Sequence, residues 1–175
     1  VNKKKILVVG KSFYKNLDTS LKVFKNLIDR NMDILLIKLG NFEQIRIEDR
    51  YKDKIFQITN LTRQEVSEIY KITDILLFPS IYEGYGLPTL EAMKSGVPVI
   101  CSNSSSLPEI VRDAALISDY ADVNFFTDAV YRLLTDQQLY NQKKQEGIRR
   151  AEIFNISKYT NDLINLYKNS LLNIR

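Results

Sequence analysis

The stretch that decides the fold is PSIYEGYGLPTLEAMKSGVPVI, residues 79–100. An apolar segment, Ile75–Phe78, comes directly before this stretch. The second half of the stretch favours a helix that stops at Gly96. The stretch therefore predicts a strand, a glycine loop and a helix in succession. Two glutamates bracket the loop, with Glu83 just after the strand and Glu91 in the first turn of the predicted helix.

The predicted loop has the chemistry of an anion site. Gly84 and Gly86 permit positive φ angles and a close approach of the backbone, and Pro88 suits the first position of a helix. The free N–H groups of a helix start, with the helix dipole behind them, favour a phosphate. A carboxylate at Glu91 beside that phosphate needs a hydroxyl donor, which a sugar or a ribose supplies. Taken alone, however, a glycine pair is more typical of an ordinary corner in an α/β fold.

Length and composition indicate one globular domain in a reducing compartment. The chain has 175 residues, of which 45% are hydrophobic and 26% charged. Its one cysteine, Cys101, excludes an internal disulfide and is more typical of a core residue than of a nucleophile. Because the sequence has no histidine, His-based acid–base catalysis and His-ligated metal sites are excluded.

Charge and hydropathy exclude two further classes of function. The net charge is +4, but the lysines are scattered and no basic motif interleaved with aromatic residues occurs, so we expect no nucleic-acid partner. No apolar run reaches the roughly 18 residues of a membrane span. The basic start, followed by the short apolar run at residues 6–9, does not have the pattern of a signal peptide.

Apolar segments alternate with helix-forming segments along the chain. The uniformly apolar strands and the helices between them predict an α/β, Rossmann-like doubly wound parallel sheet of about six strands with a helical C-terminal tail. The tail begins near Phe125, and we expect Leu163, Leu166 and Tyr167 of its last helix to face inward. The predicted strands are Ile6–Gly10, Ile34–Leu39, Ile55–Ile58, Ile75–Phe78, Val97–Cys101 and Ala115–Ile117.

Several helix starts carry capping signals. Thr62 with Glu65, and Ser106 with Glu109, fit the capping box, in which the two side chains bond each other's backbone N–H groups. The segment Phe42–Lys54 is polar and shows no periodicity. Further candidate caps are Asn16 or Asp18 for the first helix and Ser157 for the last.

Two charged loops follow predicted strands. Lys11 and Lys15 lie in the loop after the first strand, and residues 83–87 lie in the loop after the fourth. Because ligands of parallel sheets bind at the carboxyl ends of the strands, we expect both loops to contribute to one site. The two ammonium groups would then hold a diphosphate. The alternative is a solvated loop with two exposed lysines.

The string around Glu83 and Glu91 resembles a known family. Its E-x7-E spacing and the residues around it closely resemble the donor-binding domain of retaining glycosyltransferases of the GT-B fold, family 4 (group 1). The resemblance covers almost the whole chain, because the Gly10–Asn16 loop, the SSLPEI segment at Ser105–Ile110 and the helical tail occur in the expected order. It implies that residues 1–175 are a single nucleotide-sugar (donor) binding domain, one half of a GT-B fold, without the N-terminal acceptor domain.

The resemblance also implies roles for individual residues. Glu91 would bind the ribose hydroxyls, and Glu83 would bind sugar hydroxyls and stabilise positive charge at the anomeric carbon. Lys11 and Lys15 would neutralise the diphosphate, which makes Glu83 and Lys15 the catalytic candidates. The remaining candidates are Gly84, Tyr85, Gly86 and Leu87, which would hold the sugar and phosphate, and Ile58, Thr59 and Asn60, which would lie near the base.

The chain departs from the family pattern at several positions, and two departures bear on catalysis. The family usually has arginine where Lys11 stands, so a planar, bidentate guanidinium is lost and the role of Lys11 is weaker than that of Lys15. Family enzymes also draw catalytic groups from the acceptor domain. We therefore expect this chain alone to bind the donor nucleotide but to transfer sugar poorly.

The function implied by the resemblance is sugar transfer with retention from a UDP-, GDP- or ADP-sugar to a glycan or lipid acceptor, without a cofactor or metal. The implied location is cytoplasmic, with peripheral contact to the inner face of the membrane, where a basic domain suits an anionic leaflet. Competing interpretations are a stand-alone nucleotide-sugar binding module, one subunit of a split glycosyltransferase and, less well supported in a chain without histidine, a sugar-nucleotide epimerase. A dehydrogenase is disfavoured because G-x-G-x-x-G is absent.

Overall fold

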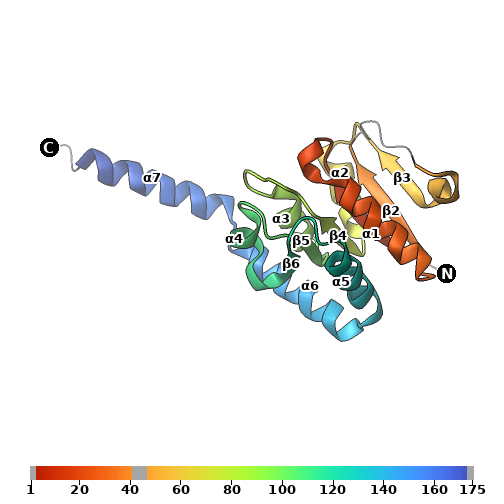
Figure 1. Cartoon of the computed structure of the whole chain (residues 1–175). Coiled ribbons are helices and arrows are strands. Elements are labelled where there is room, and N and C mark those ends of the chain that lie inside the picture. Colours follow the sequence, from red (N-terminus) through yellow and green to blue (C-terminus); the bar gives the residue numbers. More distant parts are fainter. Residues whose placement is uncertain (1–2, 41–46, 173–175) are drawn as a thin grey trace.

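The computed structural model describes residues 3–40 and 47–172 and shows a parallel sheet of six strands between layers of helices (Figure 1). The strand order is β3-β2-β1-β4-β5-β6, and each neighbouring pair is parallel. The predicted Rossmann-like doubly wound sheet is therefore confirmed. The strands are β1 Lys4–Val9, β2 Ile34–Leu39, β3 Ile55–Ile58, β4 Ile75–Phe78, β5 Val99–Ser102 and β6 Ala115–Ser118.

Three strands, β2, β3 and β4, have the predicted bounds, and the others differ by one or two residues at their ends. β1 begins at Lys4 because Lys4 and Lys5 pair through their backbones with Ile34 and Leu35 of β2, which requires no apolar side chain. It ends at Val9, since Gly10 has a φ of 118° and leaves the strand conformation.

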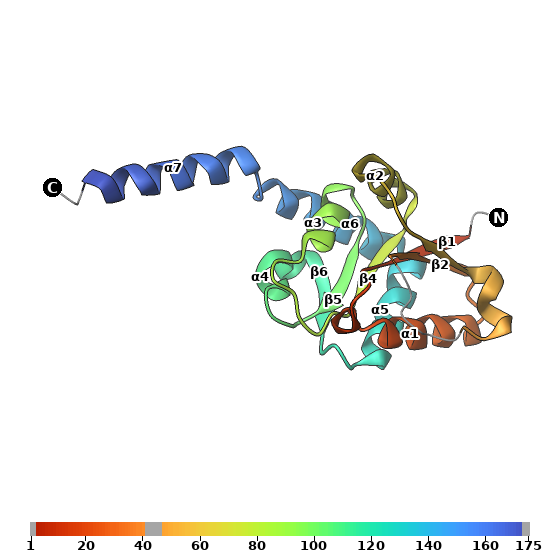
Figure 2. The same ribbon diagram turned by 90° about the horizontal axis from the view of Figure 1, so that it is seen from above.

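Helices cover both faces of the sheet (Figure 2). α1 and α5 pack with Ile6 and Val8 of β1, whereas α2, α3 and α4 pack on the opposite face with Leu7, as the twofold alternation of side chains along a strand requires. The α-helices are α1 Leu17–Asp29, α2 Arg63–Ile72, α3 Leu87–Lys94, α4 Leu107–Val111, α5 Val123–Thr135, α6 Gln137–Glu152 and α7 Ile156–Leu172, and short 3-10 segments lie at η1 Phe13–Lys15, η2 Asp49–Lys54 and η3 Arg112–Ala114.

The segment predicted to be irregular, Phe42–Lys54, is only partly described, because residues 42–46 lie outside the described residues. Its last part forms η2 and buries Tyr51, whose ring lies 6.0 Å from the ring of Phe24. Cys101 is fully buried in β5, and burial raises the pKa of its thiol to about 12. The prediction that Cys101 is a core residue is confirmed.

The capping predictions have mixed outcomes. The box of Thr62 and Glu65 is confirmed, with both reciprocal hydrogen bonds formed. The box of Ser106 and Glu109 is wrong: Ser106 makes no side-chain cap, and its hydroxyl instead donates to the backbone carbonyl of Glu83. Asn16 occupies the N-cap of α1, but its side chain bonds other loops rather than the helix.

The inward orientation predicted for the last helix is wrong. α7 begins at Ile156, so Ser157 lies inside the helix and not at its cap. The helix extends away from the sheet (Figure 1), and Leu163, Leu166 and Tyr167 are 38%, 62% and 64% exposed. Over the described ranges, no helix is long and apolar enough to span a membrane.

The order of the strands places a switch point at β1 and β4. From β1 the chain moves outward through β2 and β3, and it then returns to β4 on the other side and continues through β5 and β6. The crevice at the carboxyl ends of the two strands on either side of such a reversal is where α/β sheets bind ligands. The loops after β1 and β4, which carry Lys11, Lys15 and Glu83, begin at this point.

Candidate active site

The loop between β4 and α3 needs glycine at one of its two glycine positions. Gly86 has a φ of 86° and serves as the N-cap of α3. A Cβ atom there would lie 2.7 Å from Cδ2 of Leu107, so both the backbone angle and the space exclude a side chain. Gly84 does not have a positive φ and has open space around it, so of the two glycines only Gly86 uses the conformational freedom that glycine permits.

The helix α3 starts one residue earlier than the sequence suggested, since Pro88 was expected at its first position. Because Gly86 is the N-cap, Leu87 is the first helical residue and Pro88 the second. Glu91 is then the fifth residue of the helix, and its predicted place in the first turn is wrong. Its carboxylate accepts a hydrogen bond of 2.9 Å from the hydroxyl of Tyr70. Burial, followed by the charge of Glu91, raises the pKa of the Tyr70 hydroxyl.

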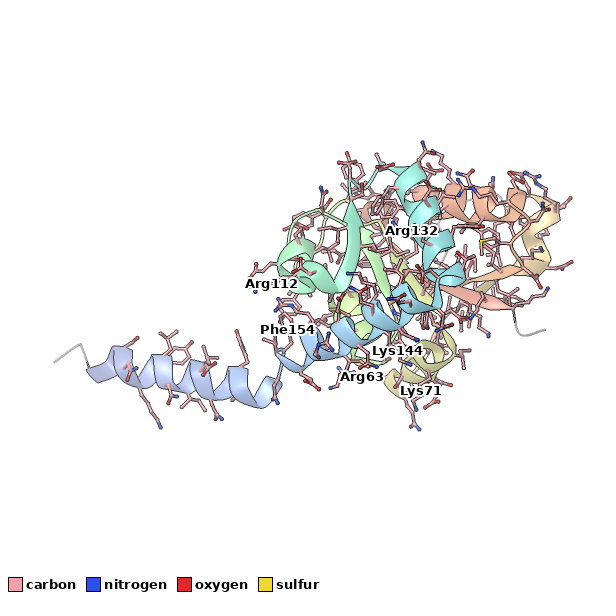
Figure 3. All side chains as sticks on the ribbon, turned by 90° about the horizontal axis from the view of Figure 1, so that it is seen from below. Arg63, Lys71, Arg112, Arg132, Lys144 and Phe154 are labelled. Atoms are coloured by element: carbon pink, nitrogen blue, oxygen red, sulfur yellow. The ribbon has the colours of Figure 1, made fainter. Side chains whose placement is uncertain are left out.

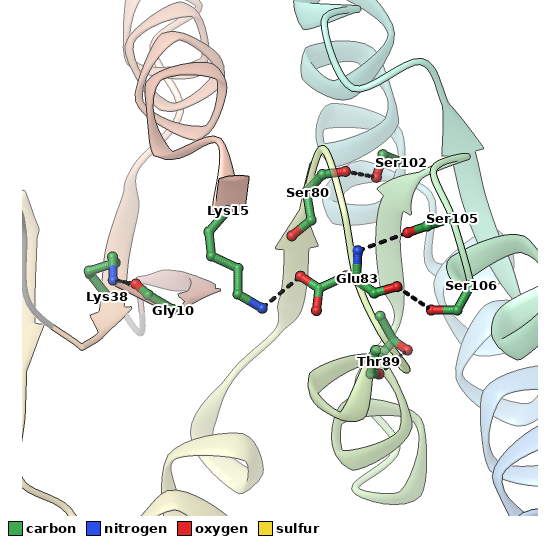
Figure 4. Close-up of polar contacts among 10 residues, drawn as sticks. Gly10, Lys15, Lys38, Ser80, Glu83, Thr89, Ser102, Ser105 and Ser106 are labelled. Atoms are coloured by element: carbon green, nitrogen blue, oxygen red, sulfur yellow. Dashed lines mark hydrogen bonds and ion pairs between the residues drawn. The ribbon is translucent and has the colours of Figure 1, made fainter. Parts of the chain in front are cut away.

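Glu83 is held by residues from two other loops (Figure 4). Its backbone N–H donates to Oγ of Ser105 at 2.8 Å, and its carbonyl accepts from Oγ of Ser106 at 3.0 Å. Its carboxylate forms an ion pair of 2.6 Å with Nζ of Lys15. The side chain of Glu83 is 8% exposed and that of Lys15 is 16% exposed. The carboxylate is therefore fixed in position next to a cation at the switch point.

The loops after β1 and β4 are joined directly. The backbone N–H of Ile81 donates to the carbonyl of Tyr14 at 2.7 Å. The side-chain amide of Asn16 donates to the carbonyls of Pro79 at 3.0 Å and Tyr120 at 2.8 Å. These bonds confirm that the two loops emerge at one edge of the sheet, and they bring Lys15 and Glu83 together.

Gly10 allows Lys15 to reach Glu83. The side chain of Lys15 crosses Gly10 so closely that a Cβ atom on Gly10 would lie 2.5 Å from Cγ of Lys15. The ammonium group then lies 4.8 Å from the centre of the Phe78 ring, a position in which an aromatic face attracts a cation. The absence of a side chain at residue 10 therefore decides the path of Lys15.

Lys11 and the three residues predicted near the base border a separate cavity. Its volume is about 260 Å³, and it lies between the ends of β2 and β3 and the start of α2. Because complete ligand sites usually have roughly 300–1,000 Å³, this cavity accommodates only part of a nucleotide sugar. Its lining includes Lys11, Gly40, Ile58, Thr59, Asn60 and Val66.

Glu91 borders a different and larger cavity, together with Tyr85 and Leu87. This cavity has a volume of about 790 Å³ and lies between α3 and the junction of α6 and α7, where Phe154 is placed (Figure 3). The structure thus brings Lys15 and Glu83 into contact and groups Lys11 with Ile58, Thr59 and Asn60. It does not place Glu91 in the same cavity as Lys11.

Sequence reasoning missed four residues that shape this site. Ser105 and Ser106 hold the backbone of Glu83, and Asn16 joins the loops, whereas the sequence pattern indicates Asn16 and Ser106 only as helix caps. Lys38 was not singled out at all. Its sequence position indicates a special role, because Lys38 is the one charged residue in the apolar segment Ile34–Leu39.

Across residues 3–40 and 47–172, no group of three or more acidic or cysteine side chains is arranged to hold a metal ion. Metal independence stays a prediction. The roles assigned to the individual site residues likewise stay predictions.

A doubly wound parallel sheet with charged loops at its switch point defines a Rossmann-like ligand-binding domain. Within that class the chain belongs to the family of glycosyl transferases group 1, because the family model matches residues 1–150. The resemblance seen in the E-x7-E string is therefore confirmed.

Individual relatives agree with this assignment. The chain is 39% identical over 105 residues to the O-antigen chain mannosyltransferase B of Escherichia coli, covering 60% of this chain and 28% of that protein. It is 28% identical over 155 residues to the MMP alpha-(1->4)-mannosyltransferase of Mycolicibacterium hassiacum, covering 84% of this chain and 38% of that protein. The chain thus spans well under half the length of these two relatives.

The solved structure of sucrose-phosphate synthase from Thermosynechococcus elongatus has the same fold. It superposes with a TM-score of 0.84 at 22% sequence identity, and the match covers 98% of this chain and 46% of that chain. At this level of identity the likeness concerns the fold alone. It confirms the predicted architecture, one half of a GT-B fold.

Proposed function

We propose that this chain is the donor-binding part of a retaining glycosyltransferase, which transfers a hexose from a nucleotide-diphosphate sugar to an acceptor. The observation that carries the proposal is the ion pair of Lys15 and Glu83 at the switch point of the sheet. It places the ammonium group of Lys15, which can bind phosphate, next to the carboxylate of Glu83, which can bind sugar hydroxyls. Membership in the group 1 family supports the same assignment.

The geometry suggests how the donor would lie. The base would enter the cavity lined by Ile58, Thr59 and Asn60, with Lys11 at its border. The diphosphate would lie toward Lys15 and the backbone of residues 84–87, and the transferred sugar would lie against Glu83. An ammonium group next to the leaving diphosphate stabilises the charge that develops as the glycosidic bond breaks.

The acceptor and the location are part of the same proposal. The two relatives compared above are named as mannosyltransferases, and one acts on an O-antigen chain. We therefore infer a mannosyl donor and a glycan or lipid-linked glycan acceptor, used at the cytoplasmic face of a membrane. The acceptor would bind mainly to a further domain.

The first prediction concerns binding of the nucleotide. Calorimetric titration of this chain with UDP, GDP and ADP is expected to show binding of one of them, and Glu91→Ala is expected to weaken it about tenfold. The reason is that hydrogen bonds from ribose hydroxyls to a carboxylate contribute roughly 1.5–3 kcal/mol. Glu68→Ala, on the exposed face of α2, is the matched control. Equal affinity in the wild type and Glu91→Ala would show that Glu91 does not bind the nucleotide.

The second prediction concerns transfer. Incubated with UDP-, GDP- and ADP-mannose and a membrane extract as acceptor, this chain alone is expected to give no labelled glycan above background. The expectation follows from its coverage of only 28% and 38% of the two relatives. Incorporation of radiolabelled mannose is the measurement. Steady transfer by the 175-residue chain would show that it needs no further domain for catalysis.

A further inference from the structure

Lys38 is a cation buried inside the sheet. It lies in β2 between Ile37 and Leu39, and only 2% of its surface is exposed. Burying an ammonium group is costly unless hydrogen bonds and charges around it compensate. The proposed function so far gives Lys38 no role, although the residue lies at the carboxyl edge of the sheet.

The ammonium group of Lys38 joins the ends of β1 and β2. It donates to the carbonyl of Gly10 (Figure 4) and, at 2.9 Å, to the carbonyl of Leu39. It also lies close beneath Gly40, where a Cβ atom would be 3.5 Å from the ammonium nitrogen. Lys38 therefore bonds the end of β2 at Leu39 to the turn after β1 at Gly10, and it lies next to Gly40.

Both parts of the candidate site adjoin these two glycines. Lys15 crosses Gly10 on its way to Glu83, and Gly40 lines the cavity that Lys11 borders. The carbonyl of Gly10 is thus a point through which Lys38 fixes the start of the loop that carries both lysines. Displacing it would move the ammonium group of Lys15 relative to Glu83.

The charge that acts on Lys38 is that of Lys15, and further charged groups lie in the loops at this edge of the sheet. Lys11 and Lys15 belong to the loop after β1, and Glu83, the partner of Lys15, belongs to the loop after β4. On the adjacent strand β3 its register partner is Gln57, which is uncharged. Burial, followed by the charge of Lys15, lowers the pKa of Lys38 to about 8.

We propose that Lys38 is a positioning residue of the donor site, which fixes the Gly10 turn for Lys15 and adds a buried positive charge behind a bound diphosphate. This inference rests on the proposed function. It assigns to the edge of β2 a contribution to diphosphate recognition that neither the sequence nor the ion pair of Lys15 and Glu83 indicates.

The pH dependence follows from the sign of the interaction. A bound diphosphate favours the charged form of Lys38, so binding raises its pKa and takes up a proton. In the free protein Lys38 loses its charge as the pH rises through about 8. Diphosphate affinity is therefore highest below pH 8 and falls above it.

The experiment compares the wild type with Lys38→Met, Lys38→Arg and, as a matched surface control, Lys22→Met, whose side chain is 59% exposed. Amide hydrogen exchange of residues 10–16 is measured without nucleotide. UDP, GDP and ADP are then titrated at pH 7.5 and pH 9.5. Lys38→Met shares all other titrating groups with the wild type, including those of the nucleotide, so the difference between the two proteins isolates Lys38.

Lys38→Met is expected to speed exchange in residues 10–16 and to weaken diphosphate binding about tenfold at pH 7.5. The wild type is expected to lose about fivefold in affinity between the two pH values, since one unit of pKa change corresponds to a factor of ten. Lys38→Met is expected to lose far less, and Lys38→Arg to keep its affinity at pH 9.5 because arginine stays charged.

Two results would overturn the inference. Unchanged exchange in residues 10–16 of Lys38→Met would show that Lys38 does not position the loop, and equal pH dependence in both proteins would show that its charge does not reach the diphosphate. If the wild type binds none of the three nucleotides, the proposed function fails, and the exchange measurement alone decides the positioning role. If Lys38→Met does not fold, the affinity of Lys38→Arg at pH 9.5 decides.

Discussion

Replacing Lys15 with methionine is expected to lower the free energy of unfolding by about 2–4 kcal/mol, because it leaves a buried carboxylate without its partner. The side chains of Lys15 and Glu83 are only 16% and 8% exposed, and their charged atoms are 2.6 Å apart. Methionine keeps most of the volume of the lysine chain that crosses Gly10. Urea unfolding monitored by circular dichroism measures the change.

A double-mutant cycle separates the ion pair from the packing of the lysine chain. Lys15→Met combined with Glu83→Gln is expected to be more stable than Lys15→Met alone, since no unpaired charge remains. Lys22→Met is the control, because Lys22 and its partner Asp18 are 59% and 72% exposed and such surface pairs contribute little. Additive effects of the two single changes would show that the ion pair does not couple Lys15 to Glu83.

The ion pair of Lys15 and Glu83 also affects donor binding. A donor diphosphate would compete with Glu83 for the ammonium group of Lys15, so part of the binding energy of the donor is used to rearrange the pair. That arrangement keeps a cation at the switch point in the absence of ligand. It also means that removing Lys15 weakens binding of the bare nucleoside diphosphate, whereas removing Glu83 does not.

Much of the fold follows from the sequence, because buried parallel strands are mainly apolar, and glycine follows β1 and β2. β2, β3 and β4 have the predicted bounds. The errors lie at element ends whose position depends on the backbone and not on the side chains. Lys4 joins β1 through backbone pairing with Ile34. Gly86, in a left-handed conformation, sets the start of α3. An apolar pattern carries no information about either feature.

The helix caps and the last helix show a second limit. The hydroxyl of Ser106 can form a hydrogen bond either with the backbone of its own helix or with the carbonyl of Glu83. In the folded chain it donates to Glu83, and this depends on the tertiary structure. Leu163 and Tyr167 have the spacing of a buried helix face, yet α7 extends away from the sheet and they are exposed. Periodicity predicts which side chains share a face but not what that face contacts.

The candidate site was predictable in its parts but not in its arrangement. The rule that parallel strands present ligands at their carboxyl ends placed Lys11, Lys15 and Glu83 at one edge. The contact of Lys15 with Glu83 depends on the path of one side chain across Gly10, which no sequence rule gives. The separation of Glu91 from the cavity of Lys11 likewise required the structure.

Glu83→Gln is expected to weaken binding of the sugar nucleotide by about 30–100-fold while leaving the affinity for the bare nucleoside diphosphate unchanged or higher. The carboxylate would accept hydrogen bonds from sugar hydroxyls, and hydrogen bonds to charged groups contribute roughly 1.5–3 kcal/mol each. The bare diphosphate lacks those hydroxyls. It also gains a more accessible Lys15, whose ammonium group no longer pairs with a carboxylate.

The decisive quantity is therefore the ratio of the two affinities, measured by calorimetric titration of the same protein preparation with both ligands. A general loss of folded protein would affect both titrations alike and cancel in the ratio, whereas a contact to the sugar changes only one of them. Glu68→Gln, at a side chain that is 59% exposed and paired with Lys71, should leave the ratio as in the wild type. Equal losses for both ligands in Glu83→Gln would show that Glu83 does not contact the sugar, because only a residue that contacts the sugar can discriminate between the two.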